Sequence, residues 1–281
     1  MNDTRTRLIQ STFNAVADGY DHPVLRFFAT GAAHLATKLE LRGDEAVLDV
    51  ACGTGHASLA IAPLLPHGRV TGIDFSPAML ARVREKAAAH ALRNLELIER
   101  DMQAIDWRAE FDAAVCAFGI FFVEDMEAQL TRIATAVRPG GRVAITSFAR
   151  DYMMPLRALM MSRLAGFGVE PPPQPWLRVA SPGDCRELFQ KAGLLDVAVE
   201  EGELGYFLDG PEAWWDVVWN AGFRRLVSSL SPAEQVRFKE EHLAEIEPLR
   251  TMDGIRLNVP VLFTSGSTPR HASQHQTPTR A

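Results

Sequence analysis

Cysteines are few and long hydrophobic runs are missing, and both shortages exclude whole classes of protein. Cys52, Cys116 and Cys185 form no CxxC pair and no zinc-ligand spacing, so we expect neither a disulfide framework nor a metal site. The longest apolar stretch, 113–123, is interrupted only by Gly119 and is far shorter than the ~20 residues that span a bilayer. The first ten residues also lack an apolar signal core. The sequence therefore predicts a reduced, cytoplasmic protein without membrane insertion.

The chain also contains fewer basic than acidic residues. The chain carries 29 Lys and Arg against 35 Asp and Glu, a net charge of −6, and it contains no basic block. Nucleic-acid backbones attract strongly basic surfaces, so we expect no nucleic-acid partner. Hydrophobic residues make up 47% of the chain and charged residues 23%. This composition predicts a folded core, with or without a small cap, rather than general disorder.

What the chain does contain is an alternation of strand and helix signals. A short apolar run predicts a buried strand at 46–51, and further strands are predicted at 69–74, 95–99, 111–117 and 142–147, with helical patterns between them. Such an alternation is typical of a parallel sheet with helices on both faces. The fold class predicted from the residues is therefore α/β.

The pattern changes after Phe148. We expect two further strands at 197–201 and 255–265, separated by a helical insertion at roughly 210–255. The sequence from Ser231 to Glu234 fits a capping box at the start of a helix. Beyond residue 265 the chain is rich in Ser, Thr, Pro, His and Gln, which predicts a disordered tail.

The most informative segment runs from Leu48 to Gly55, with the sequence LDVACGTG. It follows a predicted strand and opens a predicted helix, whose free N–H groups suit an anionic group such as a carboxylate. Gly53 and Gly55 allow a tight turn and a close approach of ligand to backbone. An NAD site would favour a third glycine at position 58, which is Ser58 here. This departure weighs against an NAD-dependent oxidoreductase without excluding it.

Three carboxylates lie at the ends of three successive predicted strands. Asp49 lies at the end of the first, and Asp74 closes the second, 19 residues after Gly55, a spacing that suits a ribose diol. Asp101, next to Met102, follows the third, where a carboxylate can accept from an adenine amine. Each aspartate could instead be a turn residue or a helix cap. Their joint placement favours a nucleotide-type ligand.

These motifs resemble a known family. LDVACGTG, GIDFSPAML, ERDMQAI, FDAAVCAFG and RPGGRVAIT are similar to the successive motifs of class I S-adenosylmethionine-dependent methyltransferases. Within that superfamily the chain resembles the ubiquinone/menaquinone-biosynthesis type and its small-molecule, type 11-like relatives. Residues 13–21 resemble the segment that lies over the cofactor in such enzymes. The resemblance covers residues 13–148 and does not specify a substrate.

The resemblance implies a Rossmann-like, seven-stranded, mostly parallel sheet with a helical cap or insertion. We accordingly divide the chain into an N-terminal helical lid (1–43), an S-adenosylmethionine-binding core (44–148), the rest of the sheet with helical cap insertions (149–265) and a disordered tail (266–281).

By the same resemblance, eleven residues bind the cofactor. Asp49, Gly53 and Gly55 would hold its methionine end, Asp74 its ribose, and Asp101 with Met102 its adenine amine. The full set is Tyr20, Asp49, Ala51, Gly53, Gly55, Asp74, Phe75, Met79, Asp101, Met102 and Phe118.

The implied function is S-adenosylmethionine-dependent methyl transfer to a small, apolar or aromatic acceptor, by direct in-line transfer. Positioning alone can supply ~7–11 kcal/mol, so no protein nucleophile is required. His22 is the candidate catalytic base if the acceptor must lose a proton, although it could equally be a surface or capping histidine; His56 is the alternative. Residues 118–122 are apolar where catechol-type relatives bind magnesium, so no metal is expected. A non-catalytic, cofactor-binding regulatory protein stays open as an alternative, and the sequence does not indicate an oligomeric state.

The residues that select the acceptor are expected in two regions rich in Met and Trp, 152–179 and 212–250. Trp215 and Trp219, four residues apart, can share a helix face, whereas Trp214 cannot point the same way as Trp215. We expect at least two of these Met and Trp side chains to line a closed apolar cavity beside the transferred methyl. The simpler alternative is that they form the core of the cap itself.

Overall fold

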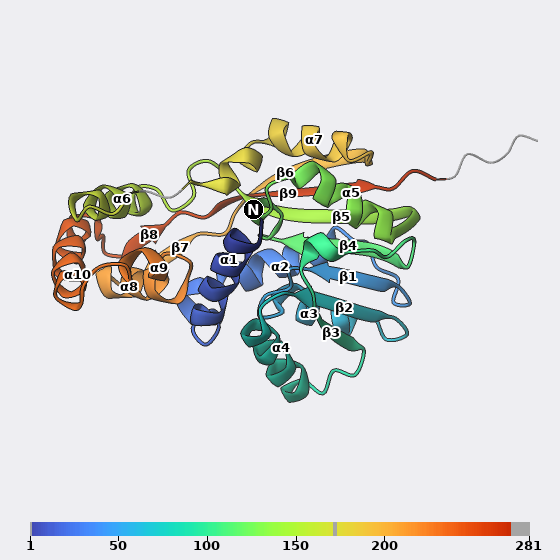
Figure 1. Ribbon diagram of the computed structural model, residues 1–281, viewed down its shortest axis with the longest axis horizontal. Coiled ribbons are helices and arrows are strands. Elements are labelled where there is room, and N and C mark those ends of the chain that lie inside the picture. Colours follow the sequence, from blue (N-terminus) through green and yellow to red (C-terminus); the bar gives the residue numbers. More distant parts are fainter. Residues whose placement is uncertain (1, 171–172, 271–281) are drawn as a thin grey trace, which may run out of the picture.

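The computed structural model describes residues 2–170 and 173–270, which are built around one seven-stranded sheet (Figure 1). The strand order is β3-β2-β1-β4-β5-β9-β6. The strands are β1 (Ala46–Val50), β2 (Arg69–Asp74), β3 (Leu95–Glu99), β4 (Phe111–Ala117), β5 (Val137–Phe148), β6 (Leu195–Glu203) and β9 (Pro260–Ser267). β9 runs antiparallel to β5 and β6, and the strands from β3 to β5 pair in parallel. The predicted Rossmann-like, mostly parallel sheet is confirmed.

The central strands are apolar because both of their faces are covered. All five residues of β1 are buried, and Val47 pairs with Val70 of β2 on one side and Ala113 of β4 on the other. Strands buried on both faces read as continuous apolar runs rather than as alternating ones. The chain order reverses between β1 and β4, and ligands of open α/β sheets bind at the carboxyl ends of strands beside such a reversal.

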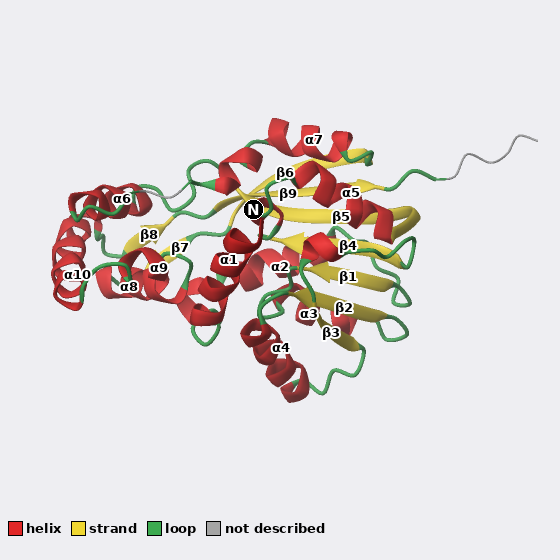
Figure 2. Ribbon diagram, viewed as in Figure 1, coloured by secondary structure: helices red, strands yellow, loops and turns green. Residues whose placement is uncertain are grey.

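Helices cover both faces of the sheet (Figure 2). α2 packs against α3 and against β4 and β5, and α5 packs against α7 and against the same two strands. The α-helices are α1 (Asn2–Val16), α2 (Phe27–Thr37), α3 (His56–Ile61), α4 (Pro77–Ala89), α5 (Met126–Ala136), α6 (Leu156–Gly166), α7 (Pro182–Lys191), α8 (Pro211–Asn220), α9 (Arg224–Val227) and α10 (Pro232–Ile246). Short 3-10 helices are η1 (Pro23–Leu25), η2 (Ala62–Leu64), η3 (Met102–Ala104), η4 (Ile120–Phe122), η5 (Pro175–Val179) and η6 (Glu247–Leu249).

Local capping signals act as the sequence predicts. Ser76 accepts a hydrogen bond from the Met79 N–H and starts α4 with Pro77 at its first position. Ser231 and Glu234 form the predicted capping box of α10. The helix predicted to follow the glycine-rich turn is divided into α3 and η2.

The prediction of a single strand at 255–265 is wrong. That segment is two strands, β8 (Ile255–Leu257) and β9, of which only β9 joins the main sheet. β8 pairs instead with β7 (Tyr206–Leu208) in a separate two-stranded sheet. β9 also continues to Ser267, two residues into the segment assigned to the tail, and residues 271–281 lie outside the described residues.

The β7–β8 sheet and helices α6, α8, α9 and α10 gather beyond one end of the main sheet (Figure 1). We call this part, residues 156–166 and 206–257, the lateral extension. α10 packs against α6 and α8, and the side chains buried between these helices are continuous with the core of the sheet. Trp215 and Trp219 stack at 6.0 Å on α8, which confirms that they share a face, while Trp214 points to the buried side. Across the described residues, no helix has the length and apolar character needed to cross a membrane.

Candidate active site

A pocket with about 960 Å³ of empty space, open mouth included, lies at the carboxyl edge of the sheet. The turns after β1, β2, β3 and β4 form its floor, and α1 with the turn that follows it lies across them (Figure 1). We call residues 2–21 the covering segment; Thr6, Ile9, Phe13 and Tyr20 from it line the pocket. The pocket therefore lies between the strand ends at the strand-order reversal and the N-terminal helix α1.

Ten of the eleven expected cofactor-binding residues line this one pocket. They are Tyr20, Asp49, Ala51, Gly53, Asp74, Phe75, Met79, Asp101, Met102 and Phe118. Gly55 is outside the lining. A Cβ added to Gly55 would lie 2.6 Å from Cγ1 of Val83, so this glycine lets α4 pack closely against the turn.

The backbone of the glycine-rich turn departs from ordinary strand and helix geometry. Gly53 and Gly55 have φ angles of +55° and +88°, which glycine adopts at little cost. Ala51 and Phe118, at the ends of β1 and β4, also have positive φ, at +54° and +56°. Non-glycine residues in this region are strained, and such strain concentrates at functional sites. A Cβ added to Gly53 would meet nothing within 4 Å, so the turn faces open space.

Asp49 is the most deeply buried carboxylate of the site. Its Oδ2 accepts a 2.6 Å hydrogen bond from the Ser58 hydroxyl, whereas its Oδ1 is buried without a partner. Burial raises the pKa of Asp49 to about 7, although the Ser58 hydrogen bonds act in the opposite direction. A buried, unpaired carboxylate oxygen at a pocket wall is an acceptor that a cationic or hydrogen-bonding ligand group can satisfy.

Asp74 organises the neighbouring turn. Its Oδ2 accepts from the Gly53 N–H at 2.9 Å and its Oδ1 from the Ser76 N–H at 2.8 Å. Burial raises the pKa of Asp74 to about 6, against the lowering effect of these backbone hydrogen bonds. Each carboxylate oxygen has a further lone pair for a ligand hydroxyl. Asp74 thus links the first two strand ends and faces the pocket.

Asp101 combines a capping role with a place at the pocket. Its Oδ1 accepts from the Gln103 N–H at 2.8 Å and begins the 3-10 helix η3. Asp101 and Met102 both line the pocket and are partly exposed to it. The helix-cap alternative and the ligand alternative are therefore compatible at this residue.

Aromatic side chains form the other wall of the pocket. Tyr20 stacks on Phe28 at 4.8 Å, Phe28 meets Phe118 edge-on at 5.3 Å, and Phe13 meets Phe122 at 5.2 Å. All five rings line the pocket. Burial, followed by the charges of Asp74 and Asp21, raises the pKa of Tyr20 well above its usual value, so its hydroxyl stays protonated.

His22, the candidate catalytic base, is not among the residues that line the pocket. Its side chain is exposed, and its Nδ1 accepts from the Val24 N–H at 3.3 Å to cap η1. His22 is thus a capping histidine, the alternative considered above, and Pro23 directly after it begins the helical turn.

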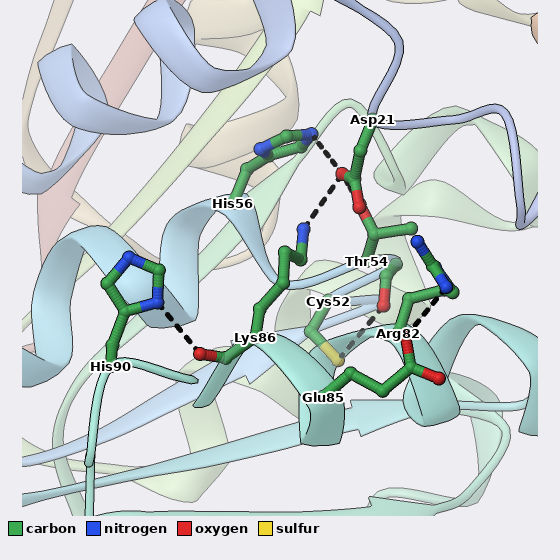
Figure 3. A network of polar contacts seen from close by, with 9 residues as sticks. Asp21, Cys52, Thr54, His56, Arg82, Glu85, Lys86 and His90 are labelled. Atoms are coloured by element: carbon green, nitrogen blue, oxygen red, sulfur yellow. Dashed lines mark hydrogen bonds and ion pairs between the residues drawn. The ribbon is translucent and has the colours of Figure 1, made fainter. Parts of the chain in front are cut away.

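His56, the alternative histidine, does line the pocket. Its Nε2 lies 3.2 Å from Oδ1 of Asp21, which also accepts from the Thr54 hydroxyl at 2.7 Å and the Lys86 ammonium at 2.8 Å (Figure 3). Burial and the positive charge of Lys86 lower the pKa of His56 to about 4, with Asp21 opposing them. His56 is therefore neutral at pH 7.

The expected cap is in a different place, and that prediction is wrong. None of the Met and Trp residues expected beside the methyl lines the pocket. Met160 and Trp214 are fully buried in the core of the lateral extension, and Tyr152 packs on Phe148 at 3.7 Å. The simpler alternative, that these side chains belong to the core, is the one observed. The pocket is covered by α1 instead.

Several pocket residues were not singled out from the sequence. Thr6 and Ile9 come from α1, Phe28 from α2, and Thr54 from within the glycine-rich turn. Thr54 could have been found because it stands between the two motif glycines. Phe28 lies in an apolar run that identifies a helix but not its neighbours. Within residues 2–170 and 173–270, no group of three or more His, Cys, Asp and Glu side chains is placed to hold a metal ion.

The donors and acceptors present fit a nucleoside cofactor with an amino-acid tail. The unpaired Oδ1 of Asp49 and the open space at Gly53 suit the tail, and Asp74 lies at the neighbouring strand end. The fold and the pocket together are those of a Rossmann-like enzyme that binds such a cofactor at its strand-order reversal.

Comparisons with known proteins narrow this class. Residues 47–141 match a family model described as a methyltransferase domain. The demethylmenaquinone methyltransferase of Shouchella clausii is 30% identical over 178 residues, which cover 58% of this chain and 76% of that protein. The aklanonic acid methyltransferase DauC of Streptomyces sp. strain C5 is 30% identical over 50% of this chain and 64% of its own length.

Solved structures agree on the fold. The YcgJ protein of Bacillus subtilis has a TM-score of 0.57 at 16% identity, covering 86% of this chain and 99% of its own. A phosphoethanolamine N-methyltransferase of Haemonchus contortus, solved with S-adenosylhomocysteine, has a TM-score of 0.54 at 16% identity, covering 92% of this chain and 60% of its own. The chain belongs to the class I S-adenosylmethionine-dependent methyltransferases. It is an enzyme that uses S-adenosylmethionine, which rules out the NAD-dependent and the non-catalytic alternatives.

Proposed function

We propose that this methyltransferase acts on a small, apolar or aromatic acceptor rather than on a nucleic acid. The observation that carries the proposal is the wall of five aromatic rings in the pocket, formed by Phe13, Tyr20, Phe28, Phe118 and Phe122. Aromatic side chains favour planar apolar ligands through burial and edge-to-face or stacked contacts. The net charge of −6 and the cover provided by α1 disfavour a nucleic-acid strand.

The roles of the individual residues form part of this proposal. Asp49, Ala51 and Gly53 hold the methionine end of the cofactor, and Gly55 supports their turn by its contact with Val83. Asp74 accepts from the ribose hydroxyls, with Phe75 and Met79 against the nucleoside. Asp101 accepts from the adenine amine, with Met102 against the ring. Phe118 flanks the methionine moiety, and Tyr20 covers its carboxylate side.

The bound cofactor supplies an electrophilic methyl group on a sulfonium. The protein's contribution is to align the acceptor with the carbon–sulfur bond and to exclude water. The aromatic wall does both, because its rings desolvate and orient a planar acceptor. Alignment of this kind can contribute ~7–11 kcal/mol to the barrier reduction. With His22 outside the pocket and His56 a weak base, the proposed transfer uses no histidine base.

The relatives named above act on demethylmenaquinone and on aklanonic acid, and these two compounds are the first acceptors to test. The enzyme is incubated with S-adenosylmethionine and either compound, or with phosphoethanolamine as a polar amine control, and S-adenosylhomocysteine is measured. We expect turnover with at least one of the first two and none with the amine. Turnover of phosphoethanolamine alone would overturn the proposal.

Phe122→Ser supplies the residue-level test. It places a hydroxyl in the aromatic wall without touching the aspartates that would hold the cofactor. We expect the KM for an aromatic acceptor to rise about tenfold, since burying an aromatic ring contributes ~1.5–3 kcal/mol. The Kd for S-adenosylhomocysteine should change less than twofold. An unchanged KM would place the acceptor elsewhere.

A further inference from the structure

Asp21 is the residue through which the covering segment contacts the glycine-rich turn. The residue before it, Tyr20, lines the pocket, whereas the Asp21 carboxylate turns toward the start of α3 and the outer side of α4 (Figure 3). Its Oδ1 accepts from Thr54 at 2.7 Å and from Lys86 at 2.8 Å and lies 3.2 Å from Nε2 of His56. One carboxylate oxygen therefore joins three structural elements to the segment that covers the pocket.

Two of these three partners are themselves part of the pocket wall. Thr54 and His56 both line it, from the turn where the amino-acid tail of the cofactor is expected. The Thr54 side chain is almost fully buried, so its hydroxyl depends on Asp21 for its hydrogen bond. When Asp21 is in place, it fixes the rotamer of Thr54, whereas Nε2 of His56 lies 3.2 Å from the same oxygen without forming a hydrogen bond.

The third partner, Lys86, supplies the positive charge that pairs with the Asp21 carboxylate. Because His56 is neutral at pH 7, Lys86 is the cation that balances Asp21. The side chains of Asp21 and Lys86 are 22% and 25% exposed, so their ion pair is partly shielded from water. Charge-assisted hydrogen bonds of this kind are roughly twice as strong as neutral ones.

The covering segment has further contacts, among them a 2.9 Å hydrogen bond from the Arg224 guanidinium to the Ala15 carbonyl and two neutral hydrogen bonds at α1. Gln10 donates to the Phe75 carbonyl at 2.5 Å, and the Ser76 hydroxyl donates to Asn14 at 2.6 Å. These contacts hold α1 over the end of β2. Asp21 holds the other end of the segment, over the end of β1.

We propose that Asp21 is a positioning residue for cofactor binding, which closes the covering segment by its contact with Lys86 and at the same time fixes Thr54 in the pocket wall. The proposal concerns how this chain holds its cofactor and does not depend on the identity of the acceptor. It predicts that breaking the Asp21 contacts loosens the covering segment in the free protein and speeds release of the cofactor product.

The test compares Asp21→Asn with Asp18→Asn, which removes the same charge from an exposed position three residues earlier. Hydrogen–deuterium exchange of the free protein is followed over residues 4–21, and binding of S-adenosylhomocysteine is measured by calorimetry and stopped-flow dissociation. For Asp21→Asn we expect faster exchange in residues 4–21, a Kd at least tenfold higher and a correspondingly higher dissociation rate. For Asp18→Asn we expect exchange and Kd within twofold of the wild type.

Lys86→Met is the second variant, and it keeps the proposal testable if Asp21→Asn fails to fold. It removes the cation from the outer side of α4 and leaves the covering segment itself unchanged. We expect it to reproduce the faster exchange of residues 4–21 and to raise the Kd threefold to tenfold. In the double variant the two effects should be less than additive, since both break one contact. An unchanged exchange rate in Lys86→Met, or a Kd within twofold of the wild type in both variants, would overturn the proposal.

Discussion

Nε1 of Trp214 donates a 2.9 Å hydrogen bond to Nε2 of His242, and both side chains are completely buried in the lateral extension. Indole can only donate, so the imidazole must accept at Nε2 and carry its proton on Nδ1, which faces Glu245 at 3.4 Å. This pair ties α8 to α10 and makes the extension sensitive to acid.

We predict that the contribution of His242 to the free energy of unfolding falls as the pH drops below about 6.5. Burial lowers the pKa of His242 below its usual value, with Glu245 opposing the shift and Arg163 adding to it. In that pH range the unfolded chain binds a proton that the folded chain does not, so acid favours unfolding. His242→Leu should remove this contribution to the pH dependence and cost about 1–3 kcal/mol at pH 7, because the Trp214 N–H loses its acceptor.

Urea unfolding between pH 5 and 8 measures both effects. His67→Leu is the control, since His67 is an exposed histidine in the loop before β2. A pH dependence that is the same in His242→Leu as in the wild type would show that another group is responsible.

A second prediction concerns Asp74. Asp74→Asn keeps the size of the side chain but removes its charge and one of the two oxygens that accept from Gly53 and Ser76. We expect the Kd for S-adenosylhomocysteine to rise at least tenfold, because charge-assisted hydrogen bonds contribute about 1.5–3 kcal/mol each. Calorimetry measures it, with Asp253→Asn, an exposed position on the turn before β8, as the matched control. Equal affinity in both variants would remove Asp74 from the cofactor site.

A third prediction follows from the raised pKa values of Asp49, about 7, and Asp74, about 6. If both carboxylates bind the cofactor in their charged form, affinity for S-adenosylhomocysteine should weaken as the pH is lowered from 8 to 5.5. Their effect on stability has the opposite sign. Between their unfolded pKa, ~3.9, and these raised values the folded chain binds more protons than the unfolded chain, so their contribution to stability decreases as the pH rises.

Calorimetric titrations at half-unit intervals test the affinity, and Asp49→Asn should flatten the part of the profile near pH 7. An affinity that is constant from pH 8 to pH 5.5 would contradict the assignment of these two residues.

A fourth prediction distinguishes the role of the pocket in binding the acceptor from the role of the lateral extension in stability. Phe13→Ala shortens a side chain that lines the pocket, whereas Trp215→Ala shortens one that packs between α8 and α10. Phe13→Ala should raise the KM for the acceptor about tenfold. Trp215→Ala should leave that KM within twofold and lower the free energy of unfolding by about 1–3 kcal/mol. Steady-state kinetics and urea unfolding distinguish the two. If Trp215→Ala raised the KM for the acceptor more than Phe13→Ala does, the extension rather than the pocket would select the acceptor.

The sheet was predictable where a strand is buried on both faces. The bounds of β2 and β4 agree with the sequence because each is a short, largely buried run with a turn signal at its end. The bounds of β3 agree as well, although β3 is an edge strand whose residues are only partly buried or exposed. The prediction of one strand at 255–265 failed because the apolar residues continue from β8, in the two-stranded sheet, to β9, in the main sheet. Asn258 donates to the Met154 carbonyl there, a contact from far along the chain that no local pattern reveals.

The site was predictable to the extent that parallel strand ends meet at one edge. Asp49, Asp74 and Asp101 come together for that reason, far apart as they are in the sequence. The covering elements were not predictable in the same way. Helical periodicity identifies an apolar face, but which surface that face meets is decided by tertiary packing. Trp214 and Met160 therefore suggested a cap over the pocket and instead form the core of the extension.

The distribution of the aromatic residues has a spectroscopic consequence. Three of the five tryptophans, Trp214, Trp215 and Trp219, lie on α8, so tryptophan emission reports mainly on the lateral extension. Of the three tyrosines, Tyr20 lines the pocket, whereas Tyr206 lies on β7 of the extension and donates from its hydroxyl to the Val24 carbonyl just beyond the covering segment. Indole emission therefore follows the extension, whereas far-ultraviolet dichroism follows the helices and strands of the whole chain. Melting recorded with both will show whether the part that binds the cofactor and the part that flanks it unfold together or in sequence.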